Sequence, residues 1–314
     1  MRRSSGKPQG GKSSQRSAAP TGRPSAGRGG RPAPAGRGGP PARHSQSRSP
    51  QGRPGQTQAR GSSQATNSSL SKSWRQIAGT HAVKEALHVR PESIKQAYVQ
   101  INLTNTPEIK ELLQIFKAKN IRCEEKSEME LAKICAGHQG AIIFSDYNPA
   151  FDYTQQGWEE QSMIVALDGV EDPHNLGAIL RTSWLMGVDG MIIPQDRAVG
   201  LTPTVHKVAC GGVEHVEIAR INNFSDPFAT LKEAGFWVYG LSHKATKSIY
   251  DIQYPEKVIW VLGAEDKGLR TTTERICDEL VSIPQASADA SYNVSVATAM
   301  ALAETKRQWA KKNN

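Results

Sequence analysis

Three polar segments hold the side chains that could do chemistry in this chain of 314 residues. They are residues 168–181, 263–270 and 283–297, and each directly follows a short apolar run typical of a buried strand. In a parallel sheet, ligands bind beyond the carboxyl ends of the strands. We therefore expect the polar side chains of the three segments to lie at one edge of a sheet.

The first segment contains Asn175 and Arg181. Pro173 and Asn175 mark a loop, and Asn175 could either cap the following helix or contact a ligand. Arg181 lies six residues further along that helix, where it could be an exposed arginine or a substrate contact. The residues alone leave both alternatives open.

The second segment places Glu265 between Gly263 and Gly268, so that the backbone could approach a ligand while the carboxylate faces the crevice. This spacing lacks the glycine pattern of a dinucleotide site and the Gly-Lys-Ser/Thr of a triphosphate loop. A nicotinamide-dependent oxidoreductase is therefore disfavoured.

The third segment contains Ser291 and Asn293, which precede an apolar C-terminal helix. Polar side chains at such a helix start need partners if they are buried, and those partners are either backbone groups or a ligand.

A basic tail precedes the regions that could fold. Residues 1–73 hold 14 Lys or Arg, no Asp or Glu and no aromatic residue, a composition that cannot bury a core and predicts disorder. The remaining 25 basic and 30 acidic residues give the rest of the chain a charge of −5. The tail is either an arm that binds RNA or a dispensable extension.

Two α/β units follow the tail. Residues 74–146 form a small unit, in which helical spacing starts near Trp74 and ends before Pro91. Residues 147–161 are predicted to be a linker. The larger unit, residues 162–314, alternates apolar strands with helices, which predicts a parallel sheet covered on both faces. Its predicted strands are residues 164–167, 191–193, 216–219, 237–241, 258–262 and 280–283.

Other site classes are disfavoured. No apolar run approaches the ~18 residues of a membrane span, and no secretory signal is present, so we expect a cytoplasmic protein. The four cysteines lack zinc spacing and are interpreted as small buried residues. Three histidines, His174, His206 and His215, are scattered and are interpreted as loop or core residues. No metal site is predicted.

Taken together, the three segments resemble the SpoU, or TrmH-like, branch of the SPOUT RNA methyltransferases. The matching strings are Asp172-Pro-His-Asn-Leu-Gly-Ala followed by Arg181, then Gly263-Ala-Glu265, then Asn293-Val-Ser-Val-Ala. The likeness covers residues 163–311. Residues 77–145 also look like the L30e-type RNA-binding domain of the bacterial enzymes that methylate a guanosine ribose in large-subunit rRNA.

The resemblance implies a fold, a cofactor and a site. The expected fold is an L30e-like α/β domain followed by a SPOUT α/β domain with a C-terminal trefoil knot, assembled as a homodimer. The cofactor is S-adenosylmethionine, and the residues implied to hold it are Gly263, Ile283, Tyr292, Leu241, Leu262 and Ala264. The active-site positions are Arg181, Asn175, Glu265, Ser291 and Asn293.

The implied reaction is 2′-O-methylation of a ribose, with a guanosine of 23S rRNA as the substrate. A tRNA substrate and a non-catalytic RNA-binding factor for ribosome assembly are the alternatives. Arg181 would contact the target nucleotide, in its own subunit or across the dimer. Because a guanidinium is normally protonated, an electrostatic role for Arg181 is the physical expectation, and a role as base is only implied by the resemblance.

Overall fold

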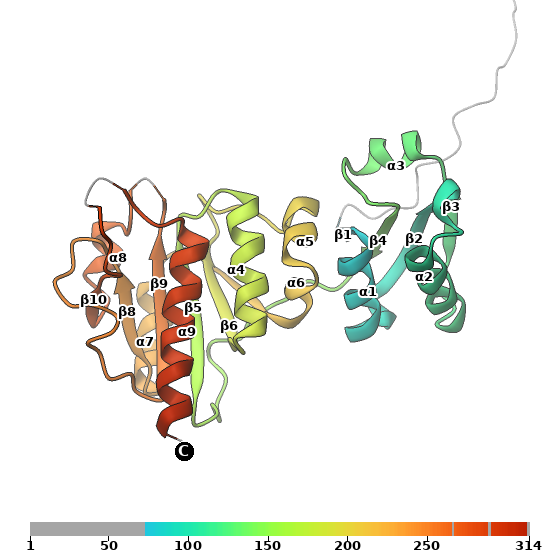
Figure 1. Ribbon diagram of the computed structural model, residues 1–314. Coiled ribbons are helices and arrows are strands. Elements are labelled where there is room, and N and C mark those ends of the chain that lie inside the picture. The colour runs from blue at the N-terminus through green and yellow to red at the C-terminus, as the bar shows by residue number, and fades with distance from the viewer. Residues whose placement is uncertain (1–72, 266, 288–289, 313–314) are drawn as a thin grey trace, which may run out of the picture. The chain divides into compact units, whose positions relative to one another are not determined.

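The computed structural model describes residues 73–265, 267–287 and 290–312 (Figure 1). The predicted basic tail lies outside these residues, except for Ser73. Two sheets organise the described part of the chain, one of four strands and one of six. None of the described helices is long and apolar enough to cross a membrane.

The four-stranded sheet belongs to a small domain with helices on both faces. Its elements are β1 (Arg75–Ala78), α1 (Thr80–Val89), β2 (Ile94–Gln100), α2 (Pro107–Ala118), β3 (Cys123–Lys126), α3 (Glu128–Ile134) and β4 (Ala141–Ser145). Strand β4 is antiparallel to β1 and β2, and β3 is parallel to β2. Val83 and Phe116, from α1 and α2, pack in one core cluster, and Leu131 from α3 packs in another.

The start of the predicted first helix is wrong. Residues 75–78 form β1, in which Ile77 lies opposite Ile143 of β4, and the helix begins only at Thr80. Gly79 separates the two elements with a φ of 99°, which is unfavourable for residues other than glycine. The antiparallel pairing therefore overrides the helical spacing that starts near Trp74.

The six-stranded sheet is parallel throughout. Its domain contains β5 (Ser162–Asp168), α4 (Pro173–Leu185), β6 (Gly190–Pro194), α5 (Pro203–Ala209), α6 (Gly212–His215), β7 (Ile218–Ile221), α7 (Ser225–Glu233), β8 (Trp237–Leu241), β9 (Lys257–Gly263), α8 (Thr271–Glu274), β10 (Glu279–Val281) and α9 (Val294–Lys312). Helices α4 and α9 cover the same face, and α7 lies on the other (Figure 1). The predicted parallel sheet with two covered faces is confirmed.

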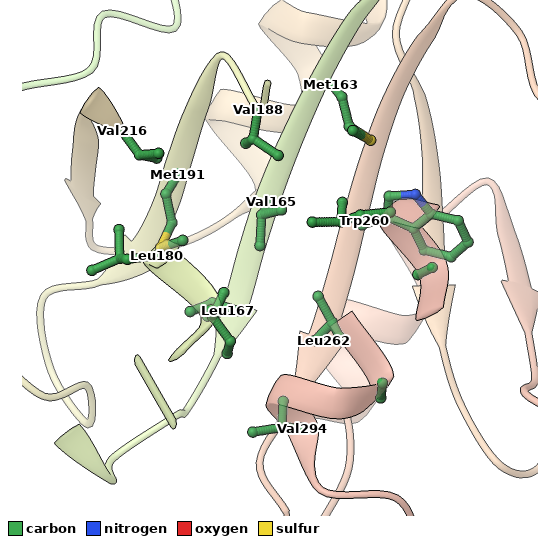
Figure 2. Close-up of a cluster of buried hydrophobic side chains, with 14 of the residues drawn as sticks. Met163, Val165, Leu167, Leu180, Val188, Met191, Val216, Trp260, Leu262 and Val294 are labelled. Atoms are coloured by element: carbon green, nitrogen blue, oxygen red, sulfur yellow. The ribbon is translucent and has the colours of Figure 1, made fainter. Parts of the chain in front are cut away.

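Alternation along each strand fills both cores of this domain. Val165 and Trp260 point into the cluster covered by α4 and α9, together with Val294 at the start of α9 (Figure 2). The neighbouring Ile164 belongs to the cluster on the opposite face. The buried Trp260 indole donates a hydrogen bond from Nε1 to Thr305 Oγ1 at 3.0 Å, which fixes α9 on β9. The start of α9 is thereby held above the carboxyl ends of the central strands.

The predicted linker, residues 147–161, contains neither helix nor strand, but it contributes to this core. Phe151 is buried on the sheet, and the Trp158 ring meets it edge-on with centroids 6.0 Å apart. A Cβ at Gly190 would lie 2.3 Å from the Phe151 ring, so the strand needs glycine there. The predicted trefoil knot stays a prediction.

Candidate active site

The carboxyl ends of two adjacent strands place the first two polar segments side by side. In the pairing of β5 with β9, Asp168 lies opposite Gly263, so the segments after these residues start at the same edge of the sheet. This is the arrangement expected from apolar parallel strands followed by polar loops.

One residue from each segment joins a hydrogen-bonded cluster. Asn175 donates from Nδ2 to Glu265 Oε2 at 3.2 Å. Asn293 donates from Nδ2 to Asn175 Oδ1 at 2.9 Å and to Glu265 Oε1 at 3.3 Å. We call Asn175, Glu265 and Asn293 the polar cluster.

Helix α4 supplies Asn175 from its first turn. Asp172 is the N-cap, because its carboxylate accepts a hydrogen bond from the backbone N–H of His174 at 2.9 Å, and Pro173 follows at the first helical position. The alternative in which Asn175 caps the helix is therefore wrong. Only 7% of Asn175 is exposed, so its amide needs the partners that the polar cluster provides.

Asn293 both starts α9 and belongs to the polar cluster. Its Oδ1 accepts hydrogen bonds from the backbone N–H of Ser295 at 2.9 Å and from the Ser295 hydroxyl at 2.6 Å. Because Oδ1 is occupied at the helix start, Nδ2 faces Asn175 and Glu265. The alternatives of a structural cap and a site contact are thus combined in one side chain.

A tight turn holds Glu265. Ala264 and Gly268 exchange backbone hydrogen bonds of 3.1 and 2.8 Å, and Gly268 has a φ of 65°. A Cβ at Gly263 would lie 2.0 Å from the carbonyl carbon of Gly268, which is closer than any side chain allows. The two glycines are therefore needed to close the turn that presents Glu265.

A first cavity of about 180 Å³ lies beside this turn. All six residues predicted to hold the cofactor line it: Leu241, Leu262, Gly263, Ala264, Ile283 and Tyr292. Glu265 and Ser291 also line it. The Tyr292 hydroxyl donates to the carbonyl oxygen of Pro284 at 3.3 Å, which fixes this ring across the segment after β10.

The lining of the first cavity fits S-adenosylmethionine. Leu241, Leu262, Val294 and Ala297 give apolar walls for a flat heterocycle, and the Glu265 carboxylate gives negative charge for a cationic donor. A Cβ at Gly268 would meet nothing within 4 Å, so the backbone there borders open space. Among the residues described, no group of three or more His, Cys, Asp or Glu could hold a metal ion.

A second cavity of about 320 Å³ adjoins the first. It lies at the carboxyl ends of β5 and β9 and is lined by Asn175 of the polar cluster. Four residues line both cavities: Ala264, Glu265, Gly268 and Val294. The Glu265 turn and the start of α9 therefore form the wall between the two cavities.

Arg181 lies away from both cavities. It follows Asn175 by six positions, which places it about 9 Å further along α4 and about 240° around the helix. Its exposed guanidinium donates from Nη1 toward Cys210 Sγ at 3.6 Å. The structure thus brings four of the five predicted active-site residues to one edge of the sheet and leaves Arg181 on another face of α4.

Comparison with known proteins identifies the family. The profile of the SpoU rRNA Methylase family matches residues 162–303, and the profile for RNA 2′-O ribose methyltransferase substrate binding matches residues 76–147. The chain is 38% identical over 244 residues to the 23S rRNA (guanosine-2′-O-)-methyltransferase RlmB of Neisseria meningitidis serogroup B, covering 76% of this chain and 97% of that protein. The chain belongs to the SpoU rRNA methylase family.

Solved structures of SpoU proteins share this fold. An AdoMet-bound rRNA methyltransferase from Sinorhizobium meliloti is 26% identical, with a TM-score of 0.62, and the match covers 74% of this chain and 86% of that one. The SpoU methyltransferase AviRb from Streptomyces viridochromogenes superimposes with a TM-score of 0.66 at 19% identity, over 76% of this chain and 91% of that one. The predicted resemblance to the SpoU branch is confirmed.

Sequence reasoning missed several residues of this SpoU site. Asp168 and Arg270 form an ion pair at 2.5 Å, and the Asp168 carboxylate is fully buried. Asp168 begins the first polar segment and Arg270 ends the second, but sequence reasoning assigns a role to neither. Ser242, His243 and Gln285 also line the first cavity. Position after a strand could have pointed to Ser242 and His243, because they directly follow β8.

The cysteine prediction is partly wrong. Cys135 is buried, but Cys123, Cys210 and Cys277 are only half-buried, and all four are free thiols. Burial still raises the pKa of the Cys277 thiol to about 12 and that of Cys123 to about 11.

Proposed function

We propose that the protein transfers the methyl group of S-adenosylmethionine to the 2′-hydroxyl of a guanosine ribose in 23S rRNA. The observation that carries the proposal is the polar cluster in the wall between two cavities, because methyl transfer needs a donor and an acceptor on opposite sides of one point. The names of the RlmB relatives support the ribose, the guanosine and the rRNA as substrate. Since bacterial rRNA is modified in the cytoplasm, the enzyme acts there.

The chain is divided into an RNA-reading domain over residues 74–146, a linker over 147–161 and a methyltransferase domain over 162–314. The match of residues 76–147 to a substrate-binding family supports the first assignment. The tail of residues 1–73 adds positive charge for a polyanion without choosing the nucleotide.

The protein's part in the reaction is positioning and electrostatics. When bound, S-adenosylmethionine would supply a methyl group on a cationic sulfur, and the ribose 2′-hydroxyl would accept that methyl group and release its proton to solvent water. Glu265 places negative charge beside the first cavity, and Asn175 and Asn293 fix that carboxylate with their amide groups. These groups hold the reactants in line, which is the main demand of such a displacement.

The active enzyme is a homodimer in which Arg181 completes the site of the other subunit. Arg181 and Leu185 are four residues apart, so they share one face of α4. Leu185 is 69% exposed, and Val296 at the start of the neighbouring α9 is 47% exposed. The exposed Leu185 beside Arg181 on α4 favours a second copy of the chain against this helix, which would place a partner beside Arg181.

A mixing experiment tests this arrangement. The Arg181→Ala and Asn293→Ala variants are each expected to be inactive, whereas subunits mixed at equal amounts should regain about a quarter of wild-type activity, because half of the dimers then hold one complete site. No recovery, with mixed dimers verified by tags of different size, would place Arg181 in its own subunit or outside catalysis.

The substrate is tested by mapping ribose methylation in total RNA from cells with and without the gene. Loss of one 2′-O-methyl guanosine in large-subunit rRNA, restored by the wild type but not by Arg181→Ala, is the expected result. Loss of a 2′-O-methyl group from tRNA would show that the substrate is tRNA and not rRNA. If no methylation is lost, a non-catalytic RNA-binding factor is favoured.

A further inference from the structure

The second cavity has a lining unlike that of the first. Where the first is largely apolar, the second combines Asn175 with the cationic side chains Arg197, Lys267 and Arg270. The two cavities share four lining residues, and one of them is Glu265 of the polar cluster. A ligand in the second cavity would therefore face the first across Glu265.

Arg270 is held in place before any ligand binds. Its backbone N–H donates to Asp168 Oδ2 at 2.9 Å, and its Nε donates to Asp168 Oδ1 at 2.5 Å. The Asp168 side chain is fully buried, whereas 43% of the Arg270 side chain is exposed. One edge of the guanidinium is thus fixed by Asp168, and its other N–H groups are left for a ligand.

Arg197 has an unusual backbone for an arginine. It follows β6 with a φ of 57°, a left-handed conformation that costs free energy in residues other than glycine. The hydrogen bond from Val199 N–H to the carbonyl oxygen of Val170, at 3.2 Å, ties its loop to the loop after β5. Arg197 forms no ion pair within the part of the chain that the structure describes, so its charge is available to an anion.

The carboxylates of this cavity are mostly engaged. Asp168 is paired with Arg270, Asp172 caps α4, and Glu265 accepts the amides of the polar cluster. Glu171 is the remaining one and is exposed. Asp172 and Glu265 keep their negative charge in these hydrogen bonds, and the cations that this cavity offers to a polyanion are Arg197, Lys267 and the remaining N–H groups of Arg270.

We propose that the second cavity binds the acceptor nucleotide of the RNA, with Arg197 and Arg270 contacting the phosphate beside the ribose that is methylated. This inference rests on the proposed methyltransferase function and deepens it. A guanidinium suits a phosphate because its N–H groups match two phosphate oxygens at once. Arg270 also lines a third cavity with Asn222 and Asn223, so the neighbouring nucleotide follows the same edge of the sheet past β7.

The test uses Arg197→Asn in the full-length chain. Asparagine tolerates the left-handed backbone but lacks the charge, so the loop is kept while the phosphate contact is lost. Arg275→Ala is the matched control, since Arg275 is exposed just after α8 and lines none of the three cavities. The measurements are single-turnover methylation of a 23S rRNA fragment, binding of that fragment at several salt concentrations, and calorimetric binding of S-adenosylmethionine.

For Arg197→Asn we expect the RNA concentration for half-maximal rate to rise about ten- to hundredfold, as for loss of a hydrogen bond to a charged group. The slope of log affinity against log salt should fall by roughly 0.7 to 1. The affinity for S-adenosylmethionine should stay within about twofold of wild type.

Two results would overturn the assignment of the second cavity. If Arg197→Asn and Arg275→Ala have the same half-maximal RNA concentration and the same salt dependence, Arg197 does not contact the RNA. If Arg197→Asn binds S-adenosylmethionine more weakly, the second cavity belongs to the cofactor. If the wild-type protein methylates no RNA, the proposed function fails, but the salt dependence of RNA binding still decides whether Arg197 meets a phosphate.

Discussion

Replacement of Glu265 by glutamine should lower methyl transfer while leaving the fold intact. Glu265 accepts one hydrogen bond at each carboxylate oxygen, from Asn175 at 3.2 Å and from Asn293 at 3.3 Å. Glutamine has the same shape but only one terminal oxygen. In either orientation its amide nitrogen faces the N–H group of one asparagine, so one hydrogen bond is lost.

The magnitude follows from the exposure of the group. A hydrogen bond to a charged partner contributes about 1.5–3 kcal/mol, and Glu265 is exposed, so water offsets part of the loss. The lower end, about 1.5 kcal/mol, corresponds to roughly a tenfold decrease in kcat/KM. Asn175 keeps its bond from Asn293 at 2.9 Å, so global stability should fall by less than about 1 kcal/mol.

Two further variants sharpen the Glu265 prediction. Glu265→Asp keeps the charge but is one methylene shorter, so it should reach only one asparagine and also lose activity. Glu233→Gln, at the exposed end of α7, removes a charge without touching the site. The assay is single-turnover methylation at saturating S-adenosylmethionine, combined with calorimetric binding of that cofactor.

The reasoning is refuted if both Glu265 variants methylate as fast as Glu233→Gln, because the polar cluster would then position nothing. If the variants lose only affinity for S-adenosylmethionine, Glu265 contributes to cofactor binding in the first cavity and not to positioning of the acceptor.

Further predictions concern the loops around the site and the thiols. Asp168→Asn leaves the half-exposed Arg270 without its counterion and should lower the free energy of unfolding by about 2–3 kcal/mol, measured by urea denaturation; an unchanged midpoint would contradict this. Gly263→Ala forces a Cβ against the Gly268 backbone and should abolish calorimetric binding of S-adenosylmethionine, and normal binding would show that the turn can open. Because burial raises the pKa of Cys277 to about 12, its reactive thiolate is scarce below that pH; iodoacetamide should label it at pH 8 only after unfolding, as peptide mass spectrometry would report.

Much of the fold could be predicted from the sequence because the buried strands are apolar and contiguous. Runs such as Ile164 to Leu167 have no other place than a sheet covered on both faces, and the parallel order follows from the helices between them. The prediction failed at residues 75–78, where a short strand gains its hydrogen bonds from β4, about 65 residues away along the chain. Local spacing contains no information on such a partner.

The polar cluster could be anticipated for the same reason. Asn175, Glu265 and Asn293 each follow a strand or start a helix above the sheet, so parallel topology alone brings them to one edge. Which asparagine would cap a helix was not decidable, because capping depends on backbone geometry. Asp172 is the N-cap of α4, so the Asn175 side chain is available for hydrogen bonds within the site.

Arg181 and Arg197 show two limits of reading residues in order. Arg181 is only six positions from Asn175, yet helix geometry turns it to another face of α4. Asn293 is far from Asn175 in the sequence, but their side chains are hydrogen-bonded. Sequence distance is therefore a poor guide to which of these side chains meet. Arg197 has a left-handed backbone conformation. In a sequence, glycine or asparagine would indicate such a conformation, whereas arginine does not. In both cases backbone geometry decides where a cation lies relative to the polar cluster, with Arg197 at the second cavity and Arg181 on another face of α4. If both proposals hold, Arg197 binds the acceptor from the same subunit and Arg181 from the partner, and the dimer is needed for catalysis because only it puts both cations beside one ribose.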